Sequence, residues 1–153
     1  MNVYTAPEHF VVPSQRPSLF LAGGISNCPD WQQDVIGGFL GCNITLINPR
    51  RPYLIDRKDM VVSEEQIKWE HKYLRLSTDI LFWFPNTSVC PIALFELGGA
   101  LERNSQYIHI GCEPDYHRLV DLKIQVALSD YTMNEIKIVH TLGDLVQQVK
   151  NTL

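Results

Sequence analysis

The sequence predicts a three-layer α/β sandwich in which about five parallel strands, in the order 2-1-3-4-5, lie between two layers of helices. Short apolar runs alternate with amphipathic segments along the whole chain, which is the pattern of repeated β-α units. The run Asp79–Phe84 is almost continuously apolar, as burial on both faces of a central strand requires. Because parallel crossovers are right-handed, such a chain is expected to wind in both directions from its first strand.

Five apolar runs are expected to form the strands, namely Ser18–Ala22, Asn43–Ile47, Asp79–Phe84, Tyr107–Ile110 and Glu135–Val139. The first run ends at Gly23 and Gly24, which are turn residues. The second run ends at Asn48-Pro49, because proline lacks the N–H that a strand ladder needs. Ligands of such sheets lie outside the carboxyl ends of the strands where the order reverses. The loops that meet there are Gly23–Cys28 and Pro85–Pro91, which makes Pro85, Asn86, Ser88 and Cys90 candidate substrate-binding residues.

Five amphipathic segments are expected to form helices, at Cys28–Gly41, Ser63–Ser77, Pro91–Arg103, Asp115–Leu128 and Thr141–Asn151. Ser63 and Gln66 match a capping box, in which each side chain bonds the backbone N–H of the other residue. Thr141 is the expected N-cap of the last helix.

Length and composition indicate one domain, residues 18–153, after an N-terminal arm at 1–17 that is expected to be disordered or to pack at an edge. Thirteen Lys and Arg against seventeen Asp and Glu give a net charge of −4, which offers no basic surface for nucleic acid. The apolar stretch Ile80–Leu101 is interrupted by prolines, so no membrane span is expected. The widely separated cysteines, Cys28, Cys42, Cys90 and Cys112, indicate neither a disulfide framework nor a metal site and favour a cytoplasmic protein.

Glu96 is the only residue from Ile80 to Leu101 that would carry a charge at neutral pH. A carboxylate among apolar residues beside a predicted cleft is a candidate catalytic group, since burying it unpaired is costly. The alternative is a helix residue that faces water or complements the helix dipole. Gly98 and Gly99 suggest that this helix closely approaches the sheet or a ligand.

Other polar features are less specific. The loop residues Gly23, Gly24, Ile25, Ser26 and Asn27 could present N–H groups and a hydroxyl to a sugar or phosphate, or form a plain turn. Glu70 and His71 could supply a polar wall and Trp69 an aromatic plate, or all three could belong to an ordinary amphipathic helix. Asp79 begins its strand at the opposite end of the sheet and is interpreted as a turn or helix-end partner. No role is assigned to His9, His109, His117 or His140.

Four segments in order along the chain resemble the nucleoside 2-deoxyribosyltransferase-like superfamily. They are FLAGGIS at 20–26, QIKWE at 66–70, TDILFWFP at 78–85 and CPIALFELG at 90–98. The similarity is greatest to the compact branch with W-E, F-W-F-P and P-I-x-L-x-E-L-G motifs, and it covers most of the chain.

The resemblance implies a flavodoxin-like fold, a homodimer or larger homo-oligomer, and cleavage or exchange of the N-glycosidic bond of nucleosides or their monophosphates. Glu96 falls on the nucleophile of a retaining mechanism, and Glu70 on a carboxylate that assists proton transfer or base recognition. No cofactor is implied. A nucleoside 5′-monophosphate hydrolase, a non-catalytic nucleotide-binding module and an NAD-cleaving enzyme are the alternatives.

Two positions depart from the superfamily pattern. Phe20 stands where a tyrosine often bonds the nucleophile, so the orienting hydroxyl must come from elsewhere or is missing. No arginine lies between Leu19 and Gln33, in the loop where nucleotide-specific relatives hold the phosphate. The phenylalanine favours the non-catalytic binding module, and the missing arginine favours a nucleoside substrate, although Arg50, Arg51 and Arg118 are placed to reach a phosphate.

Overall fold

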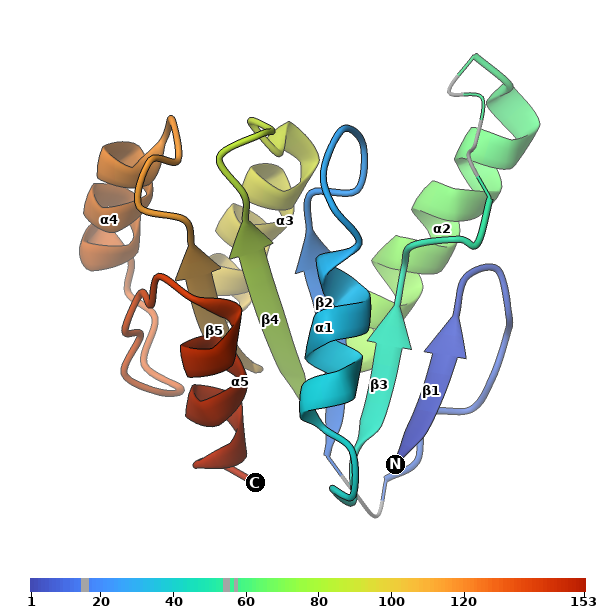
Figure 1. The fold of residues 1–153 in the computed structure, drawn as a ribbon, viewed down its shortest axis with the longest axis horizontal. Coiled ribbons are helices and arrows are strands. Elements are labelled where there is room, and N and C mark those ends of the chain that lie inside the picture. The colour runs from blue at the N-terminus through green and yellow to red at the C-terminus, as the bar shows by residue number, and fades with distance from the viewer. Residues whose placement is uncertain (15–16, 54–55, 57) are drawn as a thin grey trace.

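The computed structural model describes residues 1–14, 17–53, 56 and 58–153, and it has one all-parallel sheet between two helical layers (Figure 1). The sheet order is β1-β3-β2-β4-β5. The strands are β1 (Asn2–Thr5), β2 (Ser18–Gly23), β3 (Thr45–Asn48), β4 (Asp79–Phe84) and β5 (Tyr107–Cys112). The predicted α/β sandwich is therefore confirmed.

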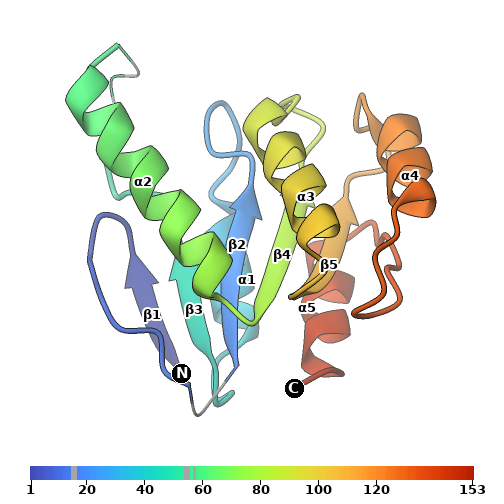
Figure 2. The same cartoon turned by 180° about the vertical axis from the view of Figure 1, so that it is seen from behind.

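The helices divide between the two faces of the sheet. They are α1 (Trp31–Gly38), α2 (Met60–Leu76), α3 (Pro91–Arg103), α4 (Leu119–Leu128) and α5 (Leu142–Lys150). Helices α1 and α5 cover one face, and Figure 2 shows α2, α3 and α4 across the other. Successive strand residues are buried on opposite faces of the sheet. Phe20 and Phe82 pack with Trp69 of α2 on one face, whereas Leu81 and Trp83 pack with Trp31 of α1 on the other.

The predicted strand order is wrong at both edges of the sheet. The expected strand Glu135–Val139 does not form, and only Val139 makes a bridge, to Gly111. The Asn134 side chain instead bonds both the N–H and the C=O of Ile108, so it occupies the edge that a further strand would need. The fifth strand is β1, which lies within the expected N-terminal arm and pairs in parallel with β3.

Helix boundaries also differ from the prediction where a different cap is used. Helix α2 begins at Met60, ahead of the expected Ser63, because the Asp59 carboxylate accepts the N–H groups of Val61 and Val62. Helix α1 begins at Trp31 and ends at Gly38, inside the expected Cys28–Gly41, and α4 begins only at Leu119. The predicted bounds of α3 and the Thr141 N-cap of α5 are confirmed, the latter by a bond from the N–H of Asp144.

The register between β2 and β4 sets the position of the site. Gly23 lies opposite Trp83, so both strands end at the same edge and the loops that follow them are neighbours. The chain reverses direction across the sheet here, since β3 lies on one side of β2 and β4 on the other.

Two glycines lead to opposite predictions for stability. Gly98 in α3 would place an added Cβ in open space, so the expected close approach of this helix is wrong there. Gly98→Ala should stabilise the protein by about 0.5–1 kcal/mol, as alanine does in helices. Gly111→Ala should destabilise it by about 1–3 kcal/mol, because the Cβ would lie 2.6 Å from Trp83 and 2.7 Å from Leu145. Urea unfolding checks both changes, and equal midpoints for the two variants would contradict this packing.

Candidate active site

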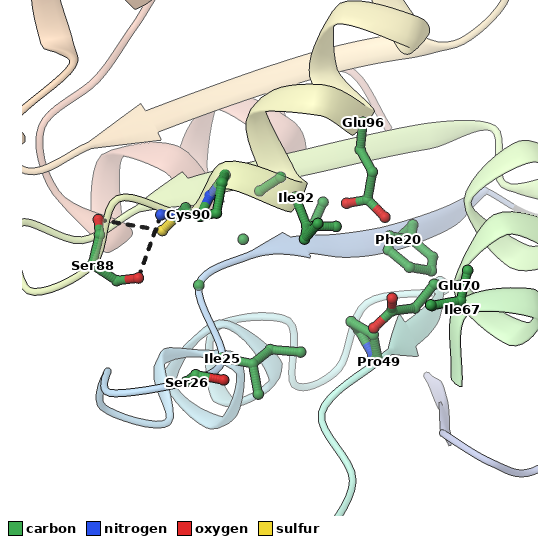
Figure 3. Close-up of a pocket in the computed structure, with 15 residues that line it drawn as sticks. Phe20, Ile25, Ser26, Pro49, Ile67, Glu70, Ser88, Cys90, Ile92 and Glu96 are labelled. Atoms are coloured by element: carbon green, nitrogen blue, oxygen red, sulfur yellow. Dashed lines mark hydrogen bonds between the residues drawn. The ribbon is translucent and has the colours of Figure 1, made fainter. Parts of the chain in front are cut away.

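A pocket of about 420 Å³ opens at the carboxyl ends of β2 and β4 (Figure 3). Strand β2 and its loop, residue 49 after β3, helix α2 and the start of α3 all contribute to its walls. The lining residues are Phe20, Ala22, Gly23, Gly24, Ile25, Ser26, Pro49, Ile67, Glu70, Ser88, Cys90, Pro91, Ile92, Ala93 and Glu96. The walls are mostly apolar, and two carboxyl groups lie at one end.

The loop after β2 is fixed by side chains from neighbouring segments. The indole N–H of Trp31 donates to the carbonyl of Gly24 at 2.7 Å. The Arg50 guanidinium donates to the carbonyls of residues 25, 28 and 29, and it lies 3.3 Å from the carboxylate of Asp30. Arg50, a predicted candidate for a phosphate contact, therefore holds this loop in place.

The loop after β4 is held by residues that follow β5. The backbone N–H of Asn86 donates to the Glu113 carboxylate at 2.7 Å, and the Tyr116 hydroxyl donates to the carbonyl of Val89 at 2.7 Å. Cys90 takes a left-handed conformation with φ 50° and is followed by Pro91, the first residue of α3. This turn directs the first turns of α3 over the pocket.

Glu96 extends from α3 into the pocket beside Phe20 (Figure 3). Burial, together with the negative charge of Glu70, raises the pKa of the Glu96 carboxyl to about 8, although the positive charge of Arg103 partly opposes both effects. The Phe20 ring offers no hydroxyl, and no hydrogen-bond partner of Glu96 is found in the part of the chain that the structure describes. Glu96 is thus a desolvated carboxyl group that resists ionisation.

Glu70 comes from α2 and lies at the same end of the pocket as Glu96, whereas Ser88 and Cys90 lie at the other end (Figure 3). Its Oε1 accepts an N–H of Gln66 at 2.8 Å. Two carboxyl groups that raise each other's proton affinity can share one proton, so the pair can offer a carboxylate and an acid together.

The structure brings most of the predicted site residues together. Gly23, Gly24, Ile25, Ser26, Ser88, Cys90, Glu70 and Glu96 all line the pocket. Asn27 lines an adjacent hollow instead. Trp69 is only 1% exposed and donates its indole N–H to the carbonyl of Glu8, so it belongs to the core. Pro85 lies beside Gly24, and Asn86 is tied to Glu113.

Several lining residues were not among the sequence candidates. Ile67 precedes Glu70 by three residues and so shares its helix face, a spacing that could have identified it. Pro49 and Ile92 reach the pocket through the topology of the sheet, for which the local sequence gives no signal.

The remaining predicted polar residues have other partners. Arg51 has a side chain that is 3% exposed and bonds Glu65 at 2.5 Å, and Arg118 pairs with Asp121 at 3.6 Å. Asp79, interpreted as a turn or helix-end partner, is buried and bonds His109 at 3.2 Å. Over the described ranges, there is no group of three or more potential metal ligands, and no helix is long and apolar enough to cross a membrane.

The raised pKa of Glu96 predicts a pH-dependent stability difference. Between its ordinary value of 4.5 and about 8, Glu96 ionises in the unfolded chain but not in the folded one, so the wild type loses stability as the pH rises. Glu96→Gln should gain stability relative to wild type by a few kcal/mol, at about 1.4 kcal/mol per pKa unit, between pH 5 and pH 9. Denaturant unfolding at several pH values measures the difference in unfolding free energy between each variant and wild type. Glu102→Gln, at an exposed position on the same helix, is the control. A Glu96→Gln difference that does not change with pH would contradict the assignment.

Comparison with known proteins agrees with this architecture. A search of curated proteins finds no match. The sequence model of the family described as nucleoside 2-deoxyribosyltransferase like matches residues 16–116. That range contains the four strands and three helices that form the pocket and its surroundings, from β2 to β5. The chain therefore belongs to the nucleoside 2-deoxyribosyltransferase-like family.

Proposed function

We propose that the protein cleaves or exchanges the N-glycosidic bond of nucleosides by a retaining mechanism, with Glu96 as the nucleophile and Glu70 as its proton-transfer partner. The observation that carries this proposal is the pairing of a desolvated Glu96 with Glu70 at one end of a 420 Å³ pocket. Family membership supports nucleoside-related glycosyl transfer in general.

The mechanism follows from the charge state of the pair. The Glu96 carboxylate attacks the anomeric carbon as the bond to the base breaks, and forms a sugar ester. The departing base takes a proton, for which Glu70 is the nearest candidate acid. Burial and mutual repulsion disfavour the doubly charged pair, and in the free protein the raised pKa of Glu96 favours the shared proton on Glu96. In the proposed reaction this proton passes to Glu70 when the substrate binds, which leaves the Glu96 carboxylate for attack and the Glu70 acid for the leaving group. Water or a second base then opens the ester from the same face, with retention.

The rest of the pocket suits the other parts of a nucleoside. Ile25, Ile67 and Ile92 provide apolar surfaces for a planar base. The Ser26 and Ser88 side chains provide hydroxyls for the sugar. No metal or cofactor is needed for these steps, since the two carboxyl groups supply both the nucleophile and the proton.

We favour a nucleoside over a nucleotide because the nearby cations already have partners. Arg50 donates to three loop carbonyls, and Arg51 is buried against Glu65 and Gln66. A phosphate could recruit either guanidinium only by breaking these bonds. The homo-oligomer implied by family resemblance remains a prediction.

A non-catalytic nucleoside-binding module is the second candidate, and the observation that favours it is Phe20. The ring lines the pocket beside Glu96 without offering a hydroxyl to orient the carboxylate. Such a module would bind nucleosides and release no base. Trapping of a sugar ester on Glu96 with a 2-fluoro nucleoside would exclude it.

Glu96→Ala should abolish base exchange between a deoxynucleoside and a free base, because no other described carboxyl group lies beside Glu70 in the pocket. Loss of a nucleophile costs orders of magnitude in rate, here expected to be at least about 10³-fold. Chromatography of released base measures the rate, and circular dichroism verifies the fold. Glu102→Ala is the matched control on the exposed face of α3 and should retain wild-type turnover. Undiminished exchange in Glu96→Ala would refute the mechanism.

Substrate preference can be tested with the same assay. We expect faster base release from deoxynucleosides than from their 5′-monophosphates, because the pocket offers no unengaged arginine among the residues that line it. Release that increases with an added acceptor base indicates a transferase, whereas indifference to the acceptor indicates a hydrolase. NAD is included as a third substrate class. Preferential cleavage of monophosphates would overturn the nucleoside assignment.

A further inference from the structure

A chain of hydrogen bonds runs from a buried arginine to Glu70. Arg51 donates through Nε to Oε1 of Gln66 at 2.6 Å, and Gln66 donates through Nε2 to Oε1 of Glu70 at 2.8 Å. The second Nε2 proton goes to the carbonyl of Pro49 at 2.8 Å. Gln66 is only 1% exposed, so its amide has exchanged water for these three partners.

The partners of Gln66 leave one orientation for its amide group. An arginine cannot accept a hydrogen bond, and a backbone carbonyl cannot donate one. Oε1 must therefore face Arg51, and the NH₂ group must face both Pro49 and Glu70. Gln66 is consequently an obligatory donor to Glu70, which favours the unprotonated state of the Glu70 oxygen that receives it.

Arg51 is itself fixed on its other side. Its Nη2 group donates to the Glu65 carboxylate at 2.5 Å, and its Nη1 group donates to the Tyr53 hydroxyl at 2.9 Å. Because Glu65, Gln66 and Glu70 share α2, this network ties the chain after β3 to the helix that carries Glu70. Neither Arg51 nor Gln66 has a place in the mechanism proposed above.

We propose that Gln66, held by Arg51 and the Pro49 carbonyl, is a positioning residue that fixes the Glu70 carboxyl group and sets its proton affinity. This inference rests on the proposed function, in which Glu70 exchanges a proton with the leaving base. The charged and titratable groups near Glu70 in the described structure include Glu96 from α3, Arg51 after β3, and Glu65 beyond Arg51. Of these, Arg51 acts on Glu70 through Gln66, and Glu96 acts across the pocket.

Gln66→Met tests the inference, since methionine matches the length of glutamine and donates no hydrogen bond. We expect the titration midpoint of Glu70 to rise by about one pH unit, because the ionised carboxylate loses one hydrogen bond that stabilises its charge. Carbon-13 NMR of glutamate-labelled protein follows this titration directly, with Glu70→Gln to assign the resonance. Because Glu70 must be protonated to act as the acid, the alkaline limb of the kcat/KM profile for a deoxynucleoside should move to higher pH as well, with kcat reduced about 10–100-fold and KM little changed.

Two further variants separate positioning from general destabilisation. Ser77→Ala is the control for lost stability, because it removes a buried hydroxyl that donates to the Leu74 carbonyl at the C-terminal end of α2. It should change neither the titration midpoint of Glu70 nor the pH profile of turnover. Arg51→Lys keeps the charge and lacks the Nε–H bond to Gln66, so it should shift the Glu70 midpoint in the same direction by a smaller amount. It also carries the test if Gln66→Met does not fold.

The outcomes distinguish this inference from the proposed function. An unmoved Glu70 midpoint in both Gln66→Met and Arg51→Lys would overturn the positioning role, even where Glu96→Ala abolishes turnover. A moved midpoint in a protein that releases no base would support the coupling of Gln66 to Glu70 and overturn the glycosidic function. A midpoint that moves equally in Ser77→Ala would also overturn the inference, because the effect would then be one of stability alone.

Discussion

The burial of Glu96 close to the negative charge of Glu70 is the constraint on which the organisation of this site depends. Burial and repulsion together raise the pKa of Glu96 to about 8, so the folded protein bears a free-energy cost whenever both groups are charged. A flexible helix would relieve that cost by turning Glu96 toward water. Helix α3 cannot turn easily, since Ala93 and Leu97 on either side of Glu96 pack into the core.

Side chains from neighbouring segments support the loops around the pocket. Backbone carbonyls at the ends of β2 and β4 would otherwise need water or ligand. Instead, Trp31 and Arg50 bond the carbonyls of the first loop, and Tyr116 bonds the second. Fixed loops keep the pocket open before a ligand arrives, which reduces the ordering that binding would require. The cost is that Arg50 is unavailable to a ligand.

Local pattern was sufficient to predict some parts of this structure from sequence. The bounds of β4 and α3 follow from an apolar run and from a proline at a helix start, and Glu96 was found as the one charged residue in that stretch. Long-range contacts determine the parts that were missed. Trp69 was expected to line the pocket, but it lies in the core, where its indole N–H donates to the carbonyl of Glu8, 61 positions away. The last predicted strand does not form because the Asn134 side chain bonds the backbone of Ile108 at the edge of β5. The hydrophobic periodicity of the sequence gives no sign of this contact.

Phe20 connects the electrostatics of the pair to its geometry. A tyrosine at this position could donate to Glu96 and lower its pKa, whereas the phenyl ring adds to its desolvation. The orientation of Glu96 must then come from the packing of α3, and the proton balance of the pair from the groups around Glu70. Since Gln66 can only donate to Glu70, it favours the negative charge there and thereby strengthens the repulsion that keeps Glu96 protonated. In the reaction that we propose, positive charge develops at the anomeric carbon of the substrate, and this charge favours the ionised Glu96 that the free protein disfavours.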